Sequence, residues 1–456
     1  MSGARERVEE NAAPAAPGPA AALVLGALWL ACGCASPAYE EADAHYYQND
    51  PDSVTAAYRE AILDNGKNAL LGIEKLLSAA LLRHDWSSAE ALAVRASTLV
   101  NIFVADEGGE QDALSFLGRE KDKPFKGEPH ERVMVDFYLG MLRLRNGDPE
   151  GALAAFRSAM QKDRGSFLLP VDESQAREGE ENAERYIYDE DLALLNILAA
   201  KCCQLLEEPA DAEKYRKKAS AILPSMVPLF DQAMDPDTNV LLIVEAGEAP
   251  RKRQSGPQGA VLAYEEGWQA ELEGISLGGE ELSFGLCEEL HYQATTLGGR
   301  EVDKLNIAKA EKQEALQIAG FATIAAGYML ASAASSSGGY RGNRKERRTQ
   351  RDLEVAGLIT IGVGIGAMIF AATAIDPSAD VRAWTMLPGT IYLAVGRVAP
   401  GAGHRLRVRA RGGGSLSQEW TDVPVEQGVN IYWIRLLPGR RGGPWIPPPR
   451  EIPPGP

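Results

Sequence analysis

Residues 137–160, FYLGMLRLRNGDPEGALAAFRSAM, contain two runs of helical periodicity separated by the turn NGDP at 146–149. The spacing of the apolar residues in each run predicts two amphipathic helices. Pro149 falls in the first turn of the second helix, where its missing N–H is harmless. Two helices joined by so short a turn can cross closely only where small residues leave room. We therefore expect the pair to pack through four residues: Gly140, Ala152, Phe156 and Ala159.

These offsets match the tetratricopeptide repeat (TPR), in which a small residue on the first helix precedes an alanine and a bulky ring on the second. The copies are 63 and 60 residues apart in this sequence, rather than about 34, so we expect long insertions at 106–130 and 164–183. The alternative is an irregular helical bundle with one coincidental TPR match. The two weaker copies have turns at 84–86 and 207–209, followed by Ala89 and Ala96, then by Ala212 and Ala219.

The charge of the chain is unevenly distributed. Residues 1–340 carry 31 basic and 55 acidic side chains, whereas residues 341–456 carry 16 and 9. The acidic front half argues against a nucleic-acid partner, which requires a basic face. The basic excess lies beside apolar segments, so a membrane explains it better.

The cysteines and histidines predict no metal site. Five cysteines, at 32, 34, 202, 203 and 287, form neither a CxxC pair nor a zinc-ligand spacing with the five histidines. Cys202 and Cys203 are adjacent in a helical pattern, where a mutual disulfide is difficult to form. We expect no cofactor, no structural zinc and no disulfide framework.

The N-terminal region resembles a bacterial export signal. An apolar run of twelve residues, AAALVLGALWLA at 20–31, precedes the sequence CGCAS. Twelve residues are too few to cross a bilayer but suit a signal peptide. Cys34, with Gly33 and Ala31 before it, fits the lipobox of lipoproteins better than Cys32 does. We expect lipidation at Cys34; the alternatives are a signal without a lipid, or a disordered tail that leads into a buried helix.

A second motif precedes the helix pair. The run FKGEPHER at 125–132 resembles the signature of an uncharacterised family of bacterial TPR-type lipoproteins. That signature has an aromatic residue, any residue, Gly-Glu, two residues and then Glu-Arg. Weaker similarities occur in LLIVEAGEAPRK at 241–252 and in DVRAW at 380–384, so the resemblance spans most of 60–435. The signature is satisfied by Phe125, Gly127, Glu128, Glu131 and Arg132.

The resemblance implies an envelope protein without known enzymatic activity, encoded near a lipoprotein activator of a peptidoglycan synthase. The residues also have a simpler physical interpretation. Glu128 and Glu131 fall in the first turn of a helix, where acidic side chains complement the dipole, and Arg132 can pair with a neighbouring carboxylate. The alternative, a catalytic pair of carboxylates, is less favoured than helix capping with a salt bridge.

From residue 238 the pattern changes to strands. The run NVLLIVEAG at 239–247 predicts a buried strand, and the run APRKRQSGPQG at 249–259 predicts a basic loop. Further along, Leu406 and Val408 alternate with arginines, which predicts a half-buried antiparallel sheet with a basic outer face. The two β pieces form one sandwich or two packed sheets. The alternating arginines are Arg405, Arg407, Arg409 and Arg411.

Two uncharged apolar runs, 315–334 and 355–375, separate the β pieces. Each is long enough to cross a bilayer as a helix. The link between them, 335–354, carries six basic and three acidic side chains, which would hold it in the cytoplasm. Gly362 and Gly366 form a GxxxG face with Gly320 expected opposite. The alternative is a hairpin buried in an oligomer or in a groove of the helical domain.

These patterns predict an α+β protein with a TPR-like α-solenoid and a small antiparallel β domain interrupted by the apolar hairpin. We expect a non-enzymatic scaffold of the cell envelope, facing the periplasm, that binds other envelope proteins through a TPR groove and membrane lipid through its anchors. The alternatives are an oligomeric membrane assembly built on the hairpin and an envelope hydrolase, for which no GxSxG or HExxH motif is present. The expected segments are a signal peptide with lipobox (1–34), a tether (35–52), a helical repeat domain (53–235), a β segment (236–312), the hairpin (313–376), a second β segment (377–437) and a disordered Pro-rich tail (438–456).

Overall fold

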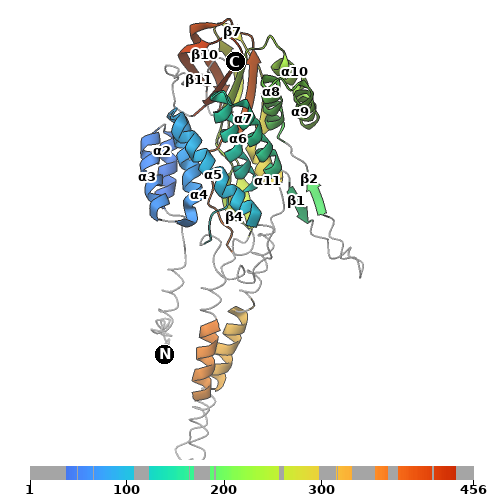
Figure 1. Cartoon of the computed structure of the whole chain (residues 1–456). Coiled ribbons are helices and arrows are strands. Elements are labelled where there is room, and N and C mark those ends of the chain that lie inside the picture. Colours follow the sequence, from blue (N-terminus) through green and yellow to red (C-terminus); the bar gives the residue numbers. More distant parts are fainter. Residues whose placement is uncertain are drawn as a thin grey trace, which may run out of the picture.

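The computed structural model has an α+β architecture, as the sequence predicts (Figure 1). It describes residues 37–48, 50–64, 66–106, 123–163, 165–168, 185–188, 192–255, 261–296, 315, 317–330, 355–367, 378–412 and 415–437. Cys34, the expected signal peptide, the whole link 335–354 and the tail 438–456 therefore lie outside the described residues.

The first half of the described chain is helical. Three helix pairs follow one another: α4 (Ala69–Leu82) with α5 (Trp86–Asp106), α6 (Pro129–Arg145) with α7 (Pro149–Asp163), and α8 (Ala193–Leu205) with α9 (Pro209–Ile222). They are preceded by α2 (Pro37–Tyr47), α3 (Pro51–Asp64) and η1 (Gly66–Asn68), and followed by η4 (Pro224–Met226) and α10 (Val227–Met234). Two short strands, β1 (Gly165–Leu168) and β2 (Arg185–Tyr188), pair antiparallel; β1 lies within the second expected insertion, 164–183, and β2 follows it.

The expected tether is folded instead. Residues 37–47 form α2, and the side chains of Ala42 and Tyr46 are buried. The polar composition of 35–52 gives no apolar periodicity, so the stretch reads as a linker. The helix is stabilised by contacts with distant residues, which sequence periodicity does not reveal.

The three pairs share one turn geometry. The second residue after the first helix of each pair has a left-handed conformation, with φ of 58° at His84, 76° at Gly147 and 60° at Glu207. A left-handed residue commonly ends a helix, because its N–H can then bond a carbonyl of the last turn. His84 N–H donates to Leu81 O and Glu207 N–H to Gln204 O in equivalent positions. The three turns therefore repeat one local structure.

The predicted packing residues of the central pair lie in its interior. Ala152, Phe156 and Ala159 have no exposed surface. The ring of Phe156 covers Gly140, so closely that a Cβ on that glycine would fall within 2.8 Å of three ring carbons. The equivalent alanines of the other pairs, Ala89, Ala96, Ala212 and Ala219, are also buried.

The second half forms two stacked sheets. One sheet has the order β12-β3-β9-β8, from β3 (Val240–Ala246), β8 (Ser283–Glu289), β9 (Thr390–Gly396) and β12 (Asn430–Arg435). The other has the order β11-β10-β6-β7, from β6 (Glu271–Leu277), β7 (Glu280–Glu281), β10 (Gly401–Arg411) and β11 (Ser415–Val425). Each sheet mixes strands from both sides of the apolar hairpin, so the two predicted β pieces form one sandwich. One pairing differs from the antiparallel expectation, because β12 runs parallel to β3.

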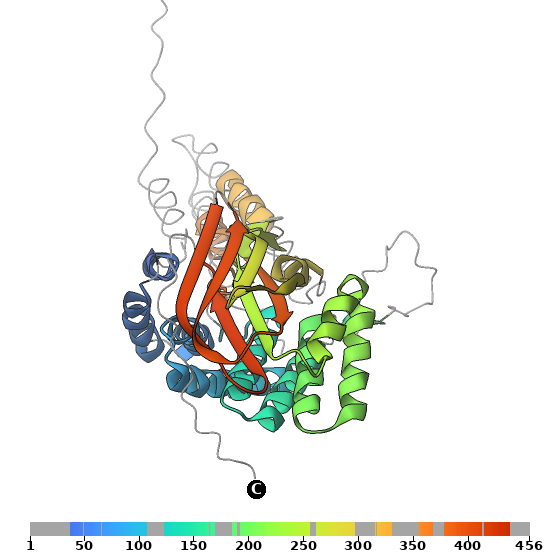
Figure 2. The same ribbon diagram turned by 90° about the horizontal axis from the view of Figure 1, so that it is seen from above.

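The helices cover one face of the first sheet. Leu241, Ile243 and Leu393 join the core of the helices, whereas the alternate residues Leu242 and Ala394 face the second sheet. Figure 2 shows the helices as an arc around the strands. Because each strand of a central layer is covered on both faces, β3 and β9 are buried along their whole length. The molecule thus has three layers: helices, sheet and sheet.

The outer face of the second sheet alternates as predicted, but it is not simply basic. Leu406 and Val408 are buried while the arginines between them are exposed. Arg405 and Arg407 pair with Glu419 on the neighbouring strand, and Arg411 pairs with Glu271 and Glu273. Cross-strand acids therefore neutralise much of the charge.

The segment expected to be a basic loop is a hairpin. Strands β4 (Arg251–Ser255) and β5 (Val261–Glu265) pair antiparallel, and α11 (Leu290–Thr296) follows β8. Pro250 and the Gly-Pro at 256–257 predict turns, and a short strand with three basic residues lacks apolar alternation. Lys252 of this strand is directed into the protein, as described below.

Residues 317–330 and 355–367 are helical and pack closely on each other. A Cβ on Gly364 would fall 2.7 Å from the carbonyl oxygen of Gly320, and one on Gly327 would fall 2.8 Å from that of Gly357. The expected GxxxG face was wrong: Gly362 and Gly366 have open space where a Cβ would stand. Among the described residues, no helix has both the length and the apolar character needed to cross a membrane. Figure 1 shows the two helices projecting from the body beyond β4.

Candidate functional site

The structure brings the five motif residues together at the start of α6. Glu128 is the residue before the helix and Pro129 its first residue. The Glu131 carboxylate reaches back and accepts a hydrogen bond of 2.6 Å from the Glu128 N–H, which completes a capping box. Gly127 adopts φ of 74°, a conformation that favours glycine. The helix-capping interpretation of the motif is therefore confirmed.

Arg132 contacts carbonyl groups at the same turn. Its Nε donates to Lys126 O at 3.0 Å and to Gly127 O at 2.9 Å. Phe125 precedes this turn, and its N–H donates to Lys67 O at 2.7 Å. The aromatic and basic ends of the motif thus hold the loop before α6 in one conformation.

Lys252 of β4 joins the sandwich to the motif. Its Nζ lies 3.2 Å from the Glu131 carboxylate and 3.3 Å from that of Glu128, and it donates to Arg382 O at 2.8 Å. The lysine side chain is only 2% exposed and that of Glu131 1%. A buried cation between two buried carboxylates is stable only while all the partners remain, because each isolated charge would be costly.

The segment 380–385, which follows the apolar hairpin, completes this junction. The Trp384 N–H donates to the Glu131 carboxylate at 2.6 Å, and its indole Nε1 donates to Ser78 Oγ at 2.8 Å. Arg382 bonds Asn68 Oδ1 at 2.7 Å and pairs with Asp380. The guanidinium also lies over the Phe125 ring, 5.6 Å from its centroid. The weaker similarity DVRAW therefore lies directly against the motif.

A second buried network lies beside the first. Lys75 of α4 donates to both carboxylate oxygens of Asp43 on α2, each at 2.7 Å, and to Thr385 Oγ1 at 3.0 Å. The Thr385 hydroxyl donates to Asp43 at 2.5 Å. The hydroxyls of Tyr58 and Tyr47 donate to Asp43 and to Thr385 O. Burial lowers the pKa of Lys75, and the charge of Asp43 opposes that effect.

Glu74 is the exception in this region. It is fully buried, and neither carboxylate oxygen has a hydrogen-bond partner among the described residues. Burial first, and then the charge of Glu131, raise its pKa well above the ordinary range of a glutamate. The site of Glu74 therefore favours the neutral, protonated form of this side chain over the carboxylate.

These contacts make a structural junction among the helices, the β4–β5 hairpin and the 380–385 segment. The carboxylates of Glu128 and Glu131 are engaged by backbone N–H groups and by Lys252. Within the described part of the chain, no group of three or more His, Cys, Asp or Glu side chains could hold a metal ion. Cys202, Cys203 and Cys287 are free and buried, and burial raises the pKa of Cys202 to about 12.

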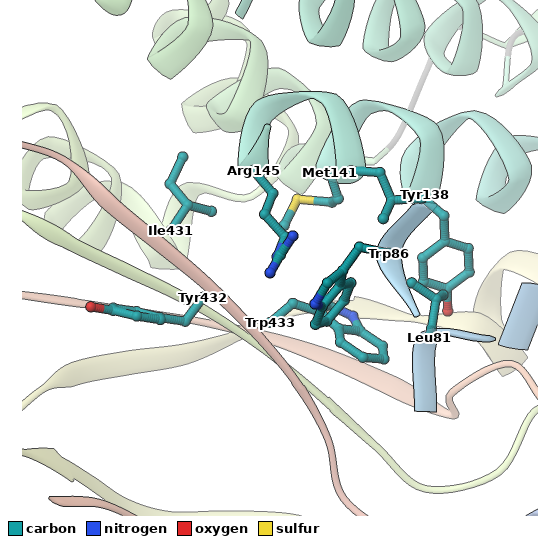
Figure 3. Close-up of a pocket in the computed structure, with 9 residues that line it drawn as sticks. Leu81, Trp86, Tyr138, Met141, Arg145, Ile431, Tyr432 and Trp433 are labelled. Atoms are coloured by element: carbon teal, nitrogen blue, oxygen red, sulfur yellow. The ribbon is translucent and has the colours of Figure 1, made fainter. Parts of the chain in front are cut away.

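A small cavity lies elsewhere, between the helices and the first sheet. Its volume is about 30 Å³, and its lining includes Leu81, Trp86, Tyr138, Arg145, Ile431 and Trp433. Figure 3 shows the guanidinium of Arg145 reaching from α6 toward Trp86 and β12. Its centre lies 3.8 Å from the Trp86 ring centroid.

The sequence identified the motif but missed its partners. Lys252, Asp43 and Lys75 come from segments far apart in the chain, and only their burial makes them important. The one available signal was the Glu74-Lys75 pair inside the apolar run ALLGIEKLLSAALL at 69–82, since charged residues are rarely buried without partners. No protein-family model matches this chain, and no curated protein is similar enough in sequence to count as a match.

Proposed function

We propose that this protein is a non-enzymatic scaffold of the bacterial envelope, held on a membrane by a lipid at Cys34 and by the apolar hairpin 313–376. The Asp43 network carries the proposal. It joins α2, which begins three residues after Cys34, to Thr385, which follows the apolar run that ends at residue 375. The three residues before α2 span at most about 11 Å, and the ten from residue 375 to Thr385 span at most about 36 Å. Both anchors therefore start within reach of the Asp43 network and could enter one membrane.

Two further features support the membrane role. Apolar side chains of the hairpin are largely exposed, with Phe321 at 61%, Tyr328 at 63% and Leu358 at 65%. Exposed apolar surface of this extent usually contacts lipid or another protein. The basic residues of the 335–354 link favour a cytoplasmic position, which leaves the helices and the sandwich in the periplasm.

We also propose that the three helix pairs are TPR-like repeats. The shared left-handed turn residue, the buried alanines and the contact between Gly140 and Phe156 support this assignment. The resemblance of the FKGEPHER motif to TPR-type lipoproteins supports it as well. The motif residues join the repeats to the sandwich, so a family with this signature would keep them for the integrity of the fold.

The sandwich occupies the face of the helices where a TPR array would bind a partner. TPR arrays commonly bind peptides along the inner face of the superhelix. Here α4, α6 and α8 are buried along nearly their whole length, and the first sheet packs against the helices. An extended peptide would have to displace the sandwich to enter that groove. We therefore place the binding of envelope proteins outside it.

A comparison of four chains tests the anchoring: the wild type, Cys34→Ser, a chain with a Gly/Ser linker in place of 315–375, and the combination of both changes. The measurement is the fraction that stays with membranes after alkaline carbonate extraction. We expect each single change to leave the protein on the membrane and the combination to release it. Cys32→Ser serves as the matched control. Retention of the combined variant in the membrane pellet, with an unchanged melting temperature, would contradict the proposal.

A second experiment tests on which side of the membrane the 335–354 link lies. We place a cysteine at Ser336 in a background with Cys202, Cys203 and Cys287 changed to serine. An impermeant maleimide added to intact spheroplasts should label this cysteine only after the membrane is broken. Labelling of intact spheroplasts would place the link outside the cytoplasm.

The second candidate function is an oligomeric membrane assembly, favoured by the same exposed apolar side chains. It predicts that the hairpin, rather than the helical domain, sets the number of copies. Crosslinking of the wild type and of the linker variant would distinguish the two functions, because only an assembly of this kind would lose its higher-order products with the hairpin.

A further inference from the structure

The cavity between the helices and the first sheet contains a cation without an anion. The Nη1 and Nη2 atoms of Arg145 are shielded from solvent and have no hydrogen-bond partner among the described residues. Burial alone lowers the pKa of this guanidinium to about 10, and no nearby acid offsets the effect.

The surroundings of Arg145 hold its guanidinium in place. The guanidinium lies over the Trp86 ring, with its central carbon 3.8 Å from the ring centroid, and Arg145 is one of the residues that line the cavity. Ile431 and Trp433 line the opposite side from β12. Figure 3 shows this arrangement, with the guanidinium between the helix and the strand. A fixed, planar set of donors in an apolar site is suited to a planar acceptor.

We propose that Arg145 and the Trp86 ring form a binding site for a carboxylate group. Such a ligand would accept hydrogen bonds from both terminal nitrogens and supply the missing negative charge. The cavity of about 30 Å³ has room for a group of carboxylate size. A single cation with no neighbouring donors matches one negative charge better than a doubly charged phosphate. This proposal does not depend on the membrane anchors.

The open edge of β12 is relevant to the source of the carboxylate. β12 is the terminal strand of its sheet, and among the described residues it pairs only with β3. The carboxylate could come from an acidic side chain of a peptide that lies near this edge, or from a small free carboxylic acid. Both sources present the same chemistry to Arg145, so the experiment must separate them.

The test measures the melting temperature of the full chain in detergent, followed by tryptophan fluorescence. The probes are sodium acetate and a capped five-residue peptide with one central aspartate. Sodium chloride and sodium sulfate at matched ionic strength, and the same peptide with asparagine, are the control ligands. Arg145→Met removes the cation while keeping an apolar chain. Arg143→Met is the matched control variant, because Arg143 lies on the same helix and donates to Gly151 O instead.

We expect a saturable rise in melting temperature of several degrees for the wild type and for Arg143→Met, and none for Arg145→Met. Half-saturation by the peptide at a concentration at least tenfold below that of acetate would identify a peptide as the source. Equal concentrations would identify a small carboxylic acid. Without ligand, Arg145→Met should melt at the same temperature as the wild type or higher, because it removes an uncompensated charge. The proposal fails if Arg145→Met melts lower without ligand, or if sulfate and carboxylates act alike on the wild type and on Arg145→Met.

Discussion

Gly140 of α6 and Phe156 of α7 are complementary in shape, since the phenyl ring occupies the space that any larger side chain at position 140 would need. The first prediction follows from this contact. Gly140→Ala should lower the free energy of unfolding by about 1–3 kcal/mol, because the added methyl group overpacks a buried contact. Chemical denaturation followed by circular dichroism measures it. Gly66→Ala is the control, because a Cβ there meets nothing within 4 Å. Equal losses for the two variants would contradict the packing.

Ala152 gives the second prediction. It has no exposed surface, whereas Glu150 two residues earlier is exposed. Ala152→Arg must bury a charge or force α6 and α7 apart, so it should cost several kcal/mol. Glu150→Arg should remain within about 0.5 kcal/mol of the wild type. Thermal unfolding of the two variants under one set of conditions would refute the helix-pair packing if their melting temperatures fell by the same amount.

The third prediction concerns the junction between the sandwich and the helices. Lys252→Met leaves the carboxylates of Glu128 and Glu131 buried without their cation, and the loss of one partner from a buried ion pair costs about 3–5 kcal/mol. Arg253→Met on the same strand is the matched control. The Arg253–Glu265 pair is more than half exposed on both sides and should contribute about 0–1 kcal/mol. A small effect of Lys252→Met in urea denaturation would show that the junction does not stabilise the fold.

The fourth prediction is a pH dependence that comes from Glu245 on β3. Burial raises the pKa of this carboxyl to about 6, although the charge of Arg435 opposes that effect. The folded protein then binds a proton more tightly than the unfolded chain does, so this group destabilises the fold as pH rises from about 4.3 through 6. Glu245→Gln should lose that dependence. The stability of the variant relative to the wild type should increase by about 2 kcal/mol between pH 4 and pH 7. Urea denaturation at each pH would disprove the shift if the difference stayed constant.

The fifth prediction tests the corrected hairpin contact. Gly364 faces the backbone of Gly320, whereas Gly366 on the same helix faces open space. Cysteines in place of Ile324 and Ile361, which each lie against a glycine of the opposite helix, should form a disulfide on oxidation. Gly364→Val should reduce the disulfide yield severalfold, and Gly366→Val should leave it unchanged. The reverse result would restore the GxxxG face that the sequence predicts.

Local patterns gave a correct account of elements whose packing depends on neighbours in the sequence. The helix pair at 137–160 and the alternating strand at 405–411 are examples, because periodicity reflects which face is buried. The predictions of a tether at 35–52 and of a loop at 249–259 were wrong for the opposite reason. Their residues are polar, and they are ordered by distant partners such as Thr385 and Glu131. The prediction of the glycine contact in the hairpin was wrong because Gly362, Gly364 and Gly366 occur together. Their spacing alone does not show which of them faces the opposite helix.

Of the two candidate sites, one could be predicted from the local sequence and the other could not. The capping role of Glu128 and Glu131 follows from their position before an apolar helix. The site at Arg145 could not be predicted from its position in the sequence, because an arginine near the end of a helix is common and usually exposed. Only the arrangement of α6 against β12 removes its charge from water.

The interleaving of strands from both sides of the apolar hairpin sets an order of events during synthesis. β3 leaves the ribosome long before β9 and β12, the two strands that flank it in the sheet. Until those strands emerge, β3 has no neighbour on either edge, and the helices have no sheet to cover their apolar side. While the hairpin is being synthesised, the nascent chain therefore exposes the apolar face of the helices and the unpaired edges of β3. The last strand to be made is the one that closes the fold.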